Sequence, residues 1–172
     1  MKPSVRIIAL VAIMSALGNV LGLLSIRLPS APGTTLAFHL SVLPSLLLAV
    51  SVGPLSGAIT GFLSLITATI QIGNPFIPFG NALFAGIAGL LAHKFKFPPA
   101  ASGAAALIPY APYMWFACSI WWSLLGLDTV ALQPIIAFII TKAFIEVLIS
   151  STLTEFILLR PEVKKFLATF KT

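Results

Sequence analysis

The stretch VALQPIIAFIITKAFIEVLISSTLTEFILL, residues 130–159, decides the fold class of this chain. It is mostly apolar, and it is longer than the about 20 residues that an α-helix needs to cross the core of a bilayer. Lys142 lies inside it, where a lysine costs roughly 2.5 to 3.5 kcal/mol on insertion scales and tends to be retained for a partner or a ligand. The stretch therefore predicts a membrane-spanning helix whose Lys142 faces the interior of a helical bundle.

The composition of the whole chain agrees with a membrane protein. Its 172 residues are 59% hydrophobic and only 8% charged, with a mean hydropathy of +1.09, whereas a soluble domain carries roughly 25% charged residues. The apolar runs are longer than the about ten-residue segments of a transmembrane barrel and do not alternate in polarity. We therefore expect an all-α membrane protein, a single domain over residues 1–172 with about six membrane-spanning helices.

Proline, glycine and charged residues divide the chain into its apolar segments. Residues 73–80 are too rich in Pro and Gly for a regular helix and too apolar for an ordinary solvated loop. We expect this segment to cover another part of the protein or to be covered itself. The expected helices are residues 6–25, 36–52, 55–72, 81–92, 101–125 and 130–159.

The basic residues predict the orientation through the positive-inside rule. With a cytoplasmic N-terminus and about six crossings, only Arg27 lies on the outer side, and both termini are cytoplasmic. We therefore expect a multi-pass protein of the plasma membrane. Because the basic residues are dispersed among helix ends, a nucleic-acid partner is not expected. The residues expected on the cytoplasmic side are Lys2, Arg6, Lys94, Lys96, Arg160, Lys164, Lys165 and Lys171.

Lys142 has two interpretations. Glu146 lies one helical turn further on the same face, so the two side chains can form an ion pair that compensates itself. Alternatively, Lys142, about 18 Å along its helix from the outer end, forms the floor of a pocket that is open to the outside. Both interpretations can hold together.

Other polar and aromatic side chains are expected on the outer halves of neighbouring helices. Trp121 and Trp122 also suit the interfacial aromatic belt, Asn81 also suits a helix N-cap, and His39 also suits an interfacial position. The candidate substrate-binding residues are His39, Asn74, Asn81, Trp115, Trp122, Lys142 and Glu146.

Small residues at a spacing of four allow close approach between helices in lipid. Ala12 and Ala16 have this spacing on the first helix, with Gly18 and Gly22 on a neighbouring face. They serve either packing within the bundle or a flat contact surface for another membrane subunit.

Enzyme motifs are mostly absent from the chain. It has no GxSxG elbow, no HExxH and no Walker-type loop, and its four acidic residues are scattered. The single cysteine, Cys118, excludes an intrachain disulfide and a CxxC site. We expect no catalytic residue, no metal site and no cofactor in this chain.

Several motifs, in this order, resemble the substrate-binding S-component of energy-coupling factor (ECF) vitamin transporters. Within that family the riboflavin type is most similar, through the turn at residues 53–57 and Lys142. At Val42, Leu43 and Ile139 the chain departs from the riboflavin pattern, so the resemblance concerns the scaffold and leaves the vitamin open. The motifs are Ala12 with Ala16, LSVLP (40–44), GPLSG (53–57), Gly80-Asn81 and TKAFIE (141–146).

The resemblance implies a subunit that binds a water-soluble vitamin from outside in a prokaryotic membrane, with riboflavin as the leading ligand. It also implies partners, a transmembrane coupling subunit that Ala12 and Ala16 contact and two cytoplasmic ATPases that use ATP. Residues 73–80 would form part of a lid. The main alternative is a non-catalytic accessory membrane subunit without a ligand, and a third is an intramembrane enzyme.

Overall fold

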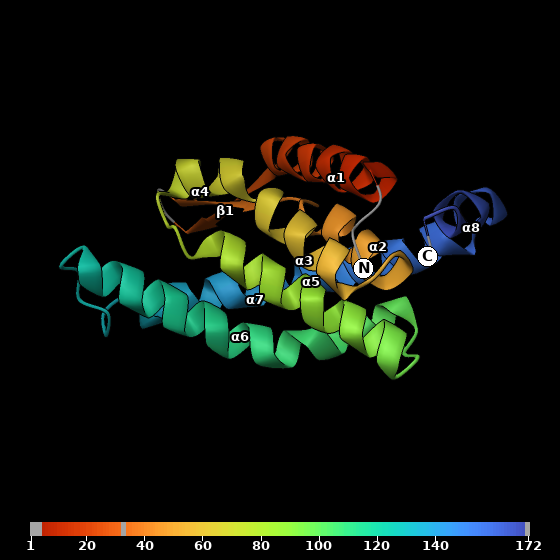
Figure 1. Ribbon diagram of the computed structural model, residues 1–172. Helices are drawn as coiled ribbons and strands as arrows, with labels where there is room; N and C mark the ends of the chain where they lie inside the picture. Colours follow the sequence, from red (N-terminus) through yellow and green to blue (C-terminus); the bar gives the residue numbers. More distant parts are fainter. Residues whose placement is uncertain (1–4, 32–33, 171–172) are drawn as a thin grey trace.

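The structure is a computed structural model that describes residues 5–31 and 34–170, so Lys2 and Lys171 lie outside the described part. Within it the chain forms a bundle of helices with a two-stranded hairpin (Figure 1). The predicted helical bundle is confirmed, and the hairpin is an addition to the all-α class that we expected. In chain order the elements are α1 (Val5–Leu23), β1 (Ile26–Ala31), β2 (Thr34–Phe38), α2 (Val42–Ser51), α3 (Pro54–Leu63), α4 (Ile66–Ile72), α5 (Ile77–Lys94), α6 (Pro99–Leu124), α7 (Gln133–Leu159) and α8 (Pro161–Ala168).

The long apolar helices fit a multi-pass membrane protein. Among the described residues, three stretches are long and apolar enough to cross a membrane: Val5–Leu23, Pro54–Ile72 and Gln133–Leu159. α2 is also apolar but has only 10 residues. The count of about six crossings stays a prediction.

The hairpin replaces a segment for which we expected a loop and the start of a helix. β1 and β2 pair in antiparallel fashion, with Ile26 opposite Phe38. The register becomes irregular next to Pro29, because proline has no N–H to donate to the ladder. The helix predicted for residues 36–52 therefore begins only at Val42.

The helix predicted for residues 55–72 is divided into α3 and α4. The break follows Leu63 and is held by Asn19 of α1. The Asn19 side-chain oxygen accepts hydrogen bonds from the N–H and the hydroxyl of Thr67, at 2.9 and 2.8 Å. Its amide nitrogen donates to the carbonyl of Leu63 at 2.8 Å. The two ends of the broken helix are thus fixed by a residue of another helix.

The helix predicted for residues 81–92 begins earlier and ends later, at Ile77 and Lys94. The second half of segment 73–80 is therefore helical, with a proline in the first turn, where its missing N–H costs no hydrogen bond. The predicted basic tail also contains a helix, α8, which follows the extended backbone of Arg160.

α2 lies at the centre of the bundle and contacts α1, α3, α5, α6 and α7. Leu46 and Phe84 are fully buried in the cluster that joins α2 to α5, α6 and α7. Leu48 is equally buried on the other side, where it packs against α1. Figure 1 shows α1 and α4 on one side of the bundle and α6 on the other.

The two ends of the bundle carry different parts of the chain. The backbone N–H of Ala100 donates to Glu155 Oε2 at 3.0 Å, which places the start of α6 beside the end of α7. Leu167 of α8 packs against Leu10 and Val11 near the start of α1. These segments share one end of the bundle, and the α6–α7 connection lies at the opposite end (Figure 1).

Candidate functional site

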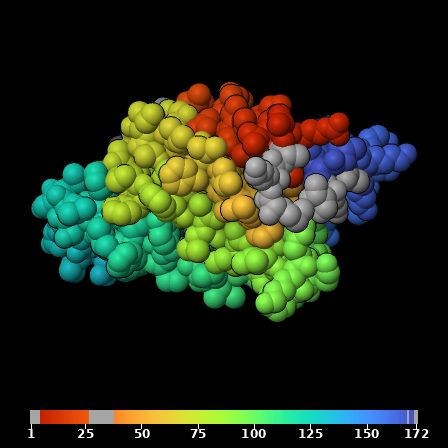
Figure 2. Space-filling view, in the orientation of Figure 1, coloured from red at the N-terminus to blue at the C-terminus, as the bar shows by residue number. Residues whose placement is uncertain are grey.

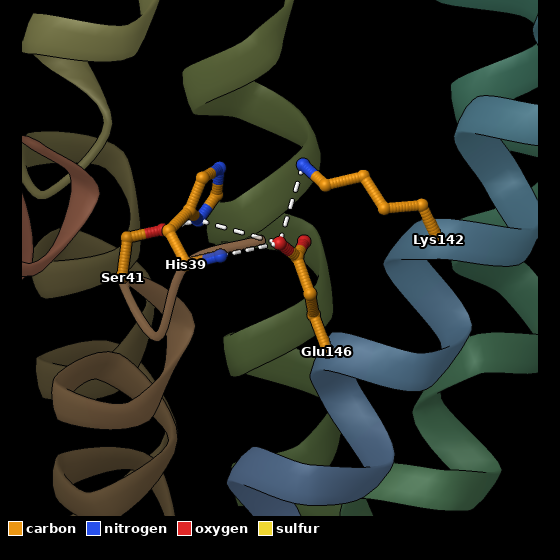
Figure 3. A network of polar contacts seen from close by, with 4 residues as sticks. All are labelled: His39, Ser41, Lys142 and Glu146. Atoms are coloured by element: carbon orange, nitrogen blue, oxygen red, sulfur yellow. Dashed lines mark hydrogen bonds and ion pairs between the residues drawn. The ribbon is translucent and has the colours of Figure 1, made fainter. Parts of the chain in front are cut away.

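Four polar residues from two parts of the chain form a charge cluster: His39, Ser41, Lys142 and Glu146 (Figure 3). Lys142 and Glu146 lie one turn apart on α7, with 3.2 Å between Lys142 Nζ and Glu146 Oε1. The same carboxylate oxygen accepts the backbone N–H of His39 at 2.7 Å. Ser41 Oγ lies 2.8 Å from His39 Nδ1. The charge cluster therefore joins the segment between β2 and α2 to α7.

The two charged side chains of the cluster differ in exposure. The Lys142 side chain is 16% exposed and that of Glu146 only 7%. A buried carboxylate is stable only when its charge is compensated. The Glu146 carboxylate pairs with the Lys142 ammonium and accepts the backbone N–H of His39. A lysine ammonium has three donors, so Lys142 can bind a further acceptor while it is paired with Glu146.

His39 lies outside the helices, between β2 and α2. Burial and, second, the positive charge of Lys142 lower its pKa from 6.5 to about 4. The imidazole is therefore neutral at pH 7. Its Nδ1 lies 3.8 Å from Glu146 Oε1, and this contact is not an ion pair at neutral pH.

A small cavity of about 40 Å³, the α6 cavity, lies between segment 73–80 and α6. It has room for water but is far smaller than the roughly 300 to 1,000 Å³ of typical small-molecule sites. Its wall is mostly apolar and aromatic. The lining residues are Asn74, Phe76, Ile77, Gly80, Tyr110, Tyr113, Met114, Ala117 and Cys118.

Tyr110 lies between the α6 cavity and the core of the bundle. It lines the cavity, and it packs against the core cluster that contains Val147, the residue after Glu146 on α7. Its ring packs on Phe84 of α5, with 5.6 Å between the ring centroids. The cavity therefore adjoins the core to which α5, α6 and α7 contribute.

Segment 73–80 is fastened to α6 by Tyr113. The Tyr113 hydroxyl donates to the carbonyl of Phe76 at 2.9 Å, and the side chain of Asn74 accepts the N–H of Phe76 at 2.9 Å. Gly80 lies so close to the tyrosine that an added Cβ would be 2.8 Å from Tyr113 Cε1. Gly73, with φ of 76°, ends α4 in the left-handed conformation that favours glycine. The segment therefore covers the α6 cavity.

The other predicted binding residues lie in different places. Asn81 is fully buried, and its side-chain nitrogen donates to the Gly61 carbonyl at 3.0 Å, which ties α5 to α3. Trp115 is 39% exposed, and Trp122 is partly exposed near the end of α6. In the described part of the chain these three residues do not line the α6 cavity.

Ala12 and Ala16 are exposed on α1. The same face carries Ile13, which is 66% exposed. The internal contacts of α1 use the neighbouring face instead, where an added Cβ on Gly18 would lie 3.2 Å from the Ser41 carbonyl oxygen. Ala12 and Ala16 therefore do not pack inside the bundle. Gly18 lies against the segment that carries His39.

Several residues of this region were missed in the sequence. Ser41 lies within the LSVLP motif but was not predicted to bind substrate. Tyr110 and Tyr113 carried no motif, because an isolated hydroxyl in an apolar run gives no spacing to recognise. The aromatic character of residues 110–116 was the available indication. Among the described residues, no three His, Cys, Asp or Glu side chains gather as metal ligands.

Comparison with known proteins agrees with this arrangement. The family model described as the S component of an ECF-type riboflavin transporter matches residues 2–159. A solved structure of the S component of a bacterial ECF transporter is similar with a TM-score of 0.51 and 23% sequence identity, over 96% of this chain and 96% of that chain. At this identity the likeness concerns the fold alone.

No curated protein matches the chain. The family is a substrate-binding component of transporters and not an enzyme. The resemblance found in the sequence is thereby confirmed, and the chain belongs to the family of ECF-type riboflavin transporter S components.

Proposed function

We propose that this chain captures a water-soluble vitamin, with riboflavin as the first candidate, and presents it for uptake into the cell. The description of the matching family supports riboflavin. The observation that carries the proposal is the Lys142–Glu146 pair, a partly exposed ammonium inside a candidate membrane-spanning helix. The same bundle contains the aromatic α6 cavity. A planar polar molecule needs both an ion or hydrogen-bond partner and an aromatic wall.

The ligand would occupy the space between the charge cluster and the α6 cavity. Lys142 donates to a ligand acceptor, and Tyr110 and Tyr113 pack on the ring. Because the cavity has only about 40 Å³, binding of a vitamin there requires segment 73–80 to move away from α6. The hydrogen bond from Tyr113 to Phe76 is the contact that this movement breaks.

The exposed alanines support a role with partner subunits. Ala12 and Ala16 leave a flat apolar face on α1 that the bundle itself does not cover. We propose that a transmembrane coupling subunit packs on this face and that two cytoplasmic ATPases supply the energy. The plasma membrane of a prokaryote, about six crossings and cytoplasmic termini complete the proposal.

Riboflavin binding by the purified full chain tests the proposal directly. Mass spectrometry of small molecules released from the protein identifies any vitamin that is retained, and quenching of riboflavin fluorescence measures its affinity. We expect a retained vitamin and saturable binding. If neither is found, the accessory-subunit interpretation, in which Lys142 and Glu146 only pair with each other, replaces this one.

A Lys142→Met variant tests the role of the ammonium. A hydrogen bond to a charged group contributes about 1.5 to 3 kcal/mol, so the affinity should fall about 10- to 100-fold. Lys96→Met, which removes an exposed lysine after α5, is the matched control and should bind normally. Equal affinity of Lys142→Met and wild type would remove Lys142 from the site.

A further inference from the structure

One end of the bundle carries most of the positive charge of the described chain. The contacts of α8 with α1 and of Ala100 with Glu155 bring three separate segments to this end. Figure 2 shows α8 beside the start of α1, with the α5–α6 connection at the same end of the molecule. The exposed basic residues here, which we name the basic rim, are Arg6, Lys94, Lys96, Arg160, Lys164 and Lys165.

Acidic residues at this end do not neutralise the basic rim. Glu155 accepts the backbone N–H of Ala100, and Glu162 lies in the first turn of α8, where it complements the helix dipole. Within the described residues, the Lys142–Glu146 pair is the salt bridge present at neutral pH, and no residue of the basic rim takes part in it. The ammonium and guanidinium groups of the basic rim are therefore available to external anions.

Exposed aromatic side chains alternate with the cations of the basic rim. Phe95, Phe97 and Phe166 are 59%, 43% and 56% exposed, and Lys94 Nζ lies 5.8 Å from the centroid of the Phe95 ring. Basic residues next to exposed apolar rings are typical of surfaces that lie at the level of lipid headgroups.

The position of α8 matches this level. α7 is a candidate membrane span and ends at Leu159, and the extended backbone of Arg160 turns the chain before α8 begins. Leu167 is only 4% exposed and anchors α8 on α1. Lys164 and Lys165 lie on the exposed part of α8, a few residues after this candidate span ends.

We propose that the basic rim binds the phosphate headgroups of anionic phospholipids. Charge complementarity and the position at the end of a membrane-spanning helix point to lipid as the occupant. The rim lies at the end opposite the α6–α7 connection, and it is independent of the vitamin site.

Native mass spectrometry of the full chain with added phosphatidylglycerol or phosphatidylcholine tests this proposal. We expect phosphatidylglycerol to bind more tightly. Lys165→Gln should weaken its binding about fivefold, and Lys164→Gln/Lys165→Gln more strongly, because each cation near an anionic surface contributes separately. Added salt should reduce the difference. Arg27→Gln, which removes one cation from β1, is the matched control and should bind as wild type.

Unchanged melting temperatures of the variants would show that they fold. Equal binding of the two lipids, or an equal loss in Arg27→Gln and Lys165→Gln, would overturn the proposal. Retention of an acidic protein in place of lipid would overturn it as well. Riboflavin binding is measured separately, so failure here leaves the vitamin proposal untouched.

Discussion

Glu146 makes its polar contacts through a single carboxylate oxygen. Oε1 lies 3.2 Å from Lys142 Nζ and 2.7 Å from the backbone nitrogen of His39. The ion pair lies on one helix and was predicted from the i, i+4 spacing. The hydrogen bond from His39 joins residues 107 apart in the sequence, so no local sequence pattern predicts it. Glu146 thus holds the segment before α2 against α7 as well as compensating Lys142.

Neutralising Glu146 tests this double role. Glu146→Gln leaves Lys142 without its counter-charge in an apolar surrounding, and removing one partner of a buried pair costs about 3 kcal/mol or more. Because Lys142 is partly exposed, we expect the lower end of that range and a lower melting temperature in detergent, measured by tryptophan fluorescence. Glu162→Gln on the exposed part of α8 should melt like wild type.

The double variant Lys142→Met/Glu146→Leu removes both charges and should recover most of the lost stability, since an apolar pair of similar volume replaces the ions. Because the glutamine of Glu146→Gln can still accept the His39 N–H and the leucine of the double variant cannot, a double variant as unstable as Glu146→Gln would show that losing the acceptor for His39 costs as much as leaving Lys142 unpaired.

At the scale of elements, the sequence predicted helices well where apolar runs are long and bounded by charges, as in α1 and α7. The predicted helix bounds were wrong where a side chain from another helix bonds to the backbone. The break between α3 and α4 lies in a continuous apolar run, and it exists because Asn19 satisfies backbone groups on both sides of it. The hairpin was missed because prolines near residues 29–32 suggest a loop.

Replacing Asn19 tests whether the break depends on it. Asn19→Leu removes hydrogen bonds to Leu63 and Thr67, and each lost bond costs about 1 kcal/mol. We expect a loss of roughly 2 to 4 kcal/mol in the free energy of unfolding, measured by denaturant titration in detergent. Gln71→Leu on the exposed part of α4 is the polar-to-apolar control, and an equal loss in both variants would refute the role of Asn19.

For the whole molecule, most of the exposed basic residues lie at one end of the bundle, apart from the end that holds the α6–α7 connection. The basic rim, α8 and the start of α1 share one end, and Asp128 lies in the α6–α7 connection at the other. The charge pattern in the sequence predicted this separation, because the positive-inside rule depends on helix ends and not on tertiary contacts. The cavity could not be predicted in the same way, since its wall is assembled from separate helices.

The orientation is testable with single cysteines in a Cys118→Ser background. Thr129→Cys, in the α6–α7 connection, should react with a membrane-impermeant maleimide in intact cells. Thr169→Cys, after α8, should react only once the cells are permeabilised, because both termini are expected in the cytoplasm. Labelling of Thr169→Cys from outside would reverse the proposed direction of transport.

The pairing of Lys142 with Glu146 has a consequence for selectivity. Any solute that reaches the ammonium meets a cation whose charge Glu146 already compensates, so a negative charge alone gains little there. Small anions such as chloride or acetate would make a single contact with the Lys142 ammonium, so we expect them to bind weakly. We therefore expect the proposed site to favour a molecule that also packs on the aromatic side chains of the α6 cavity over simple anions.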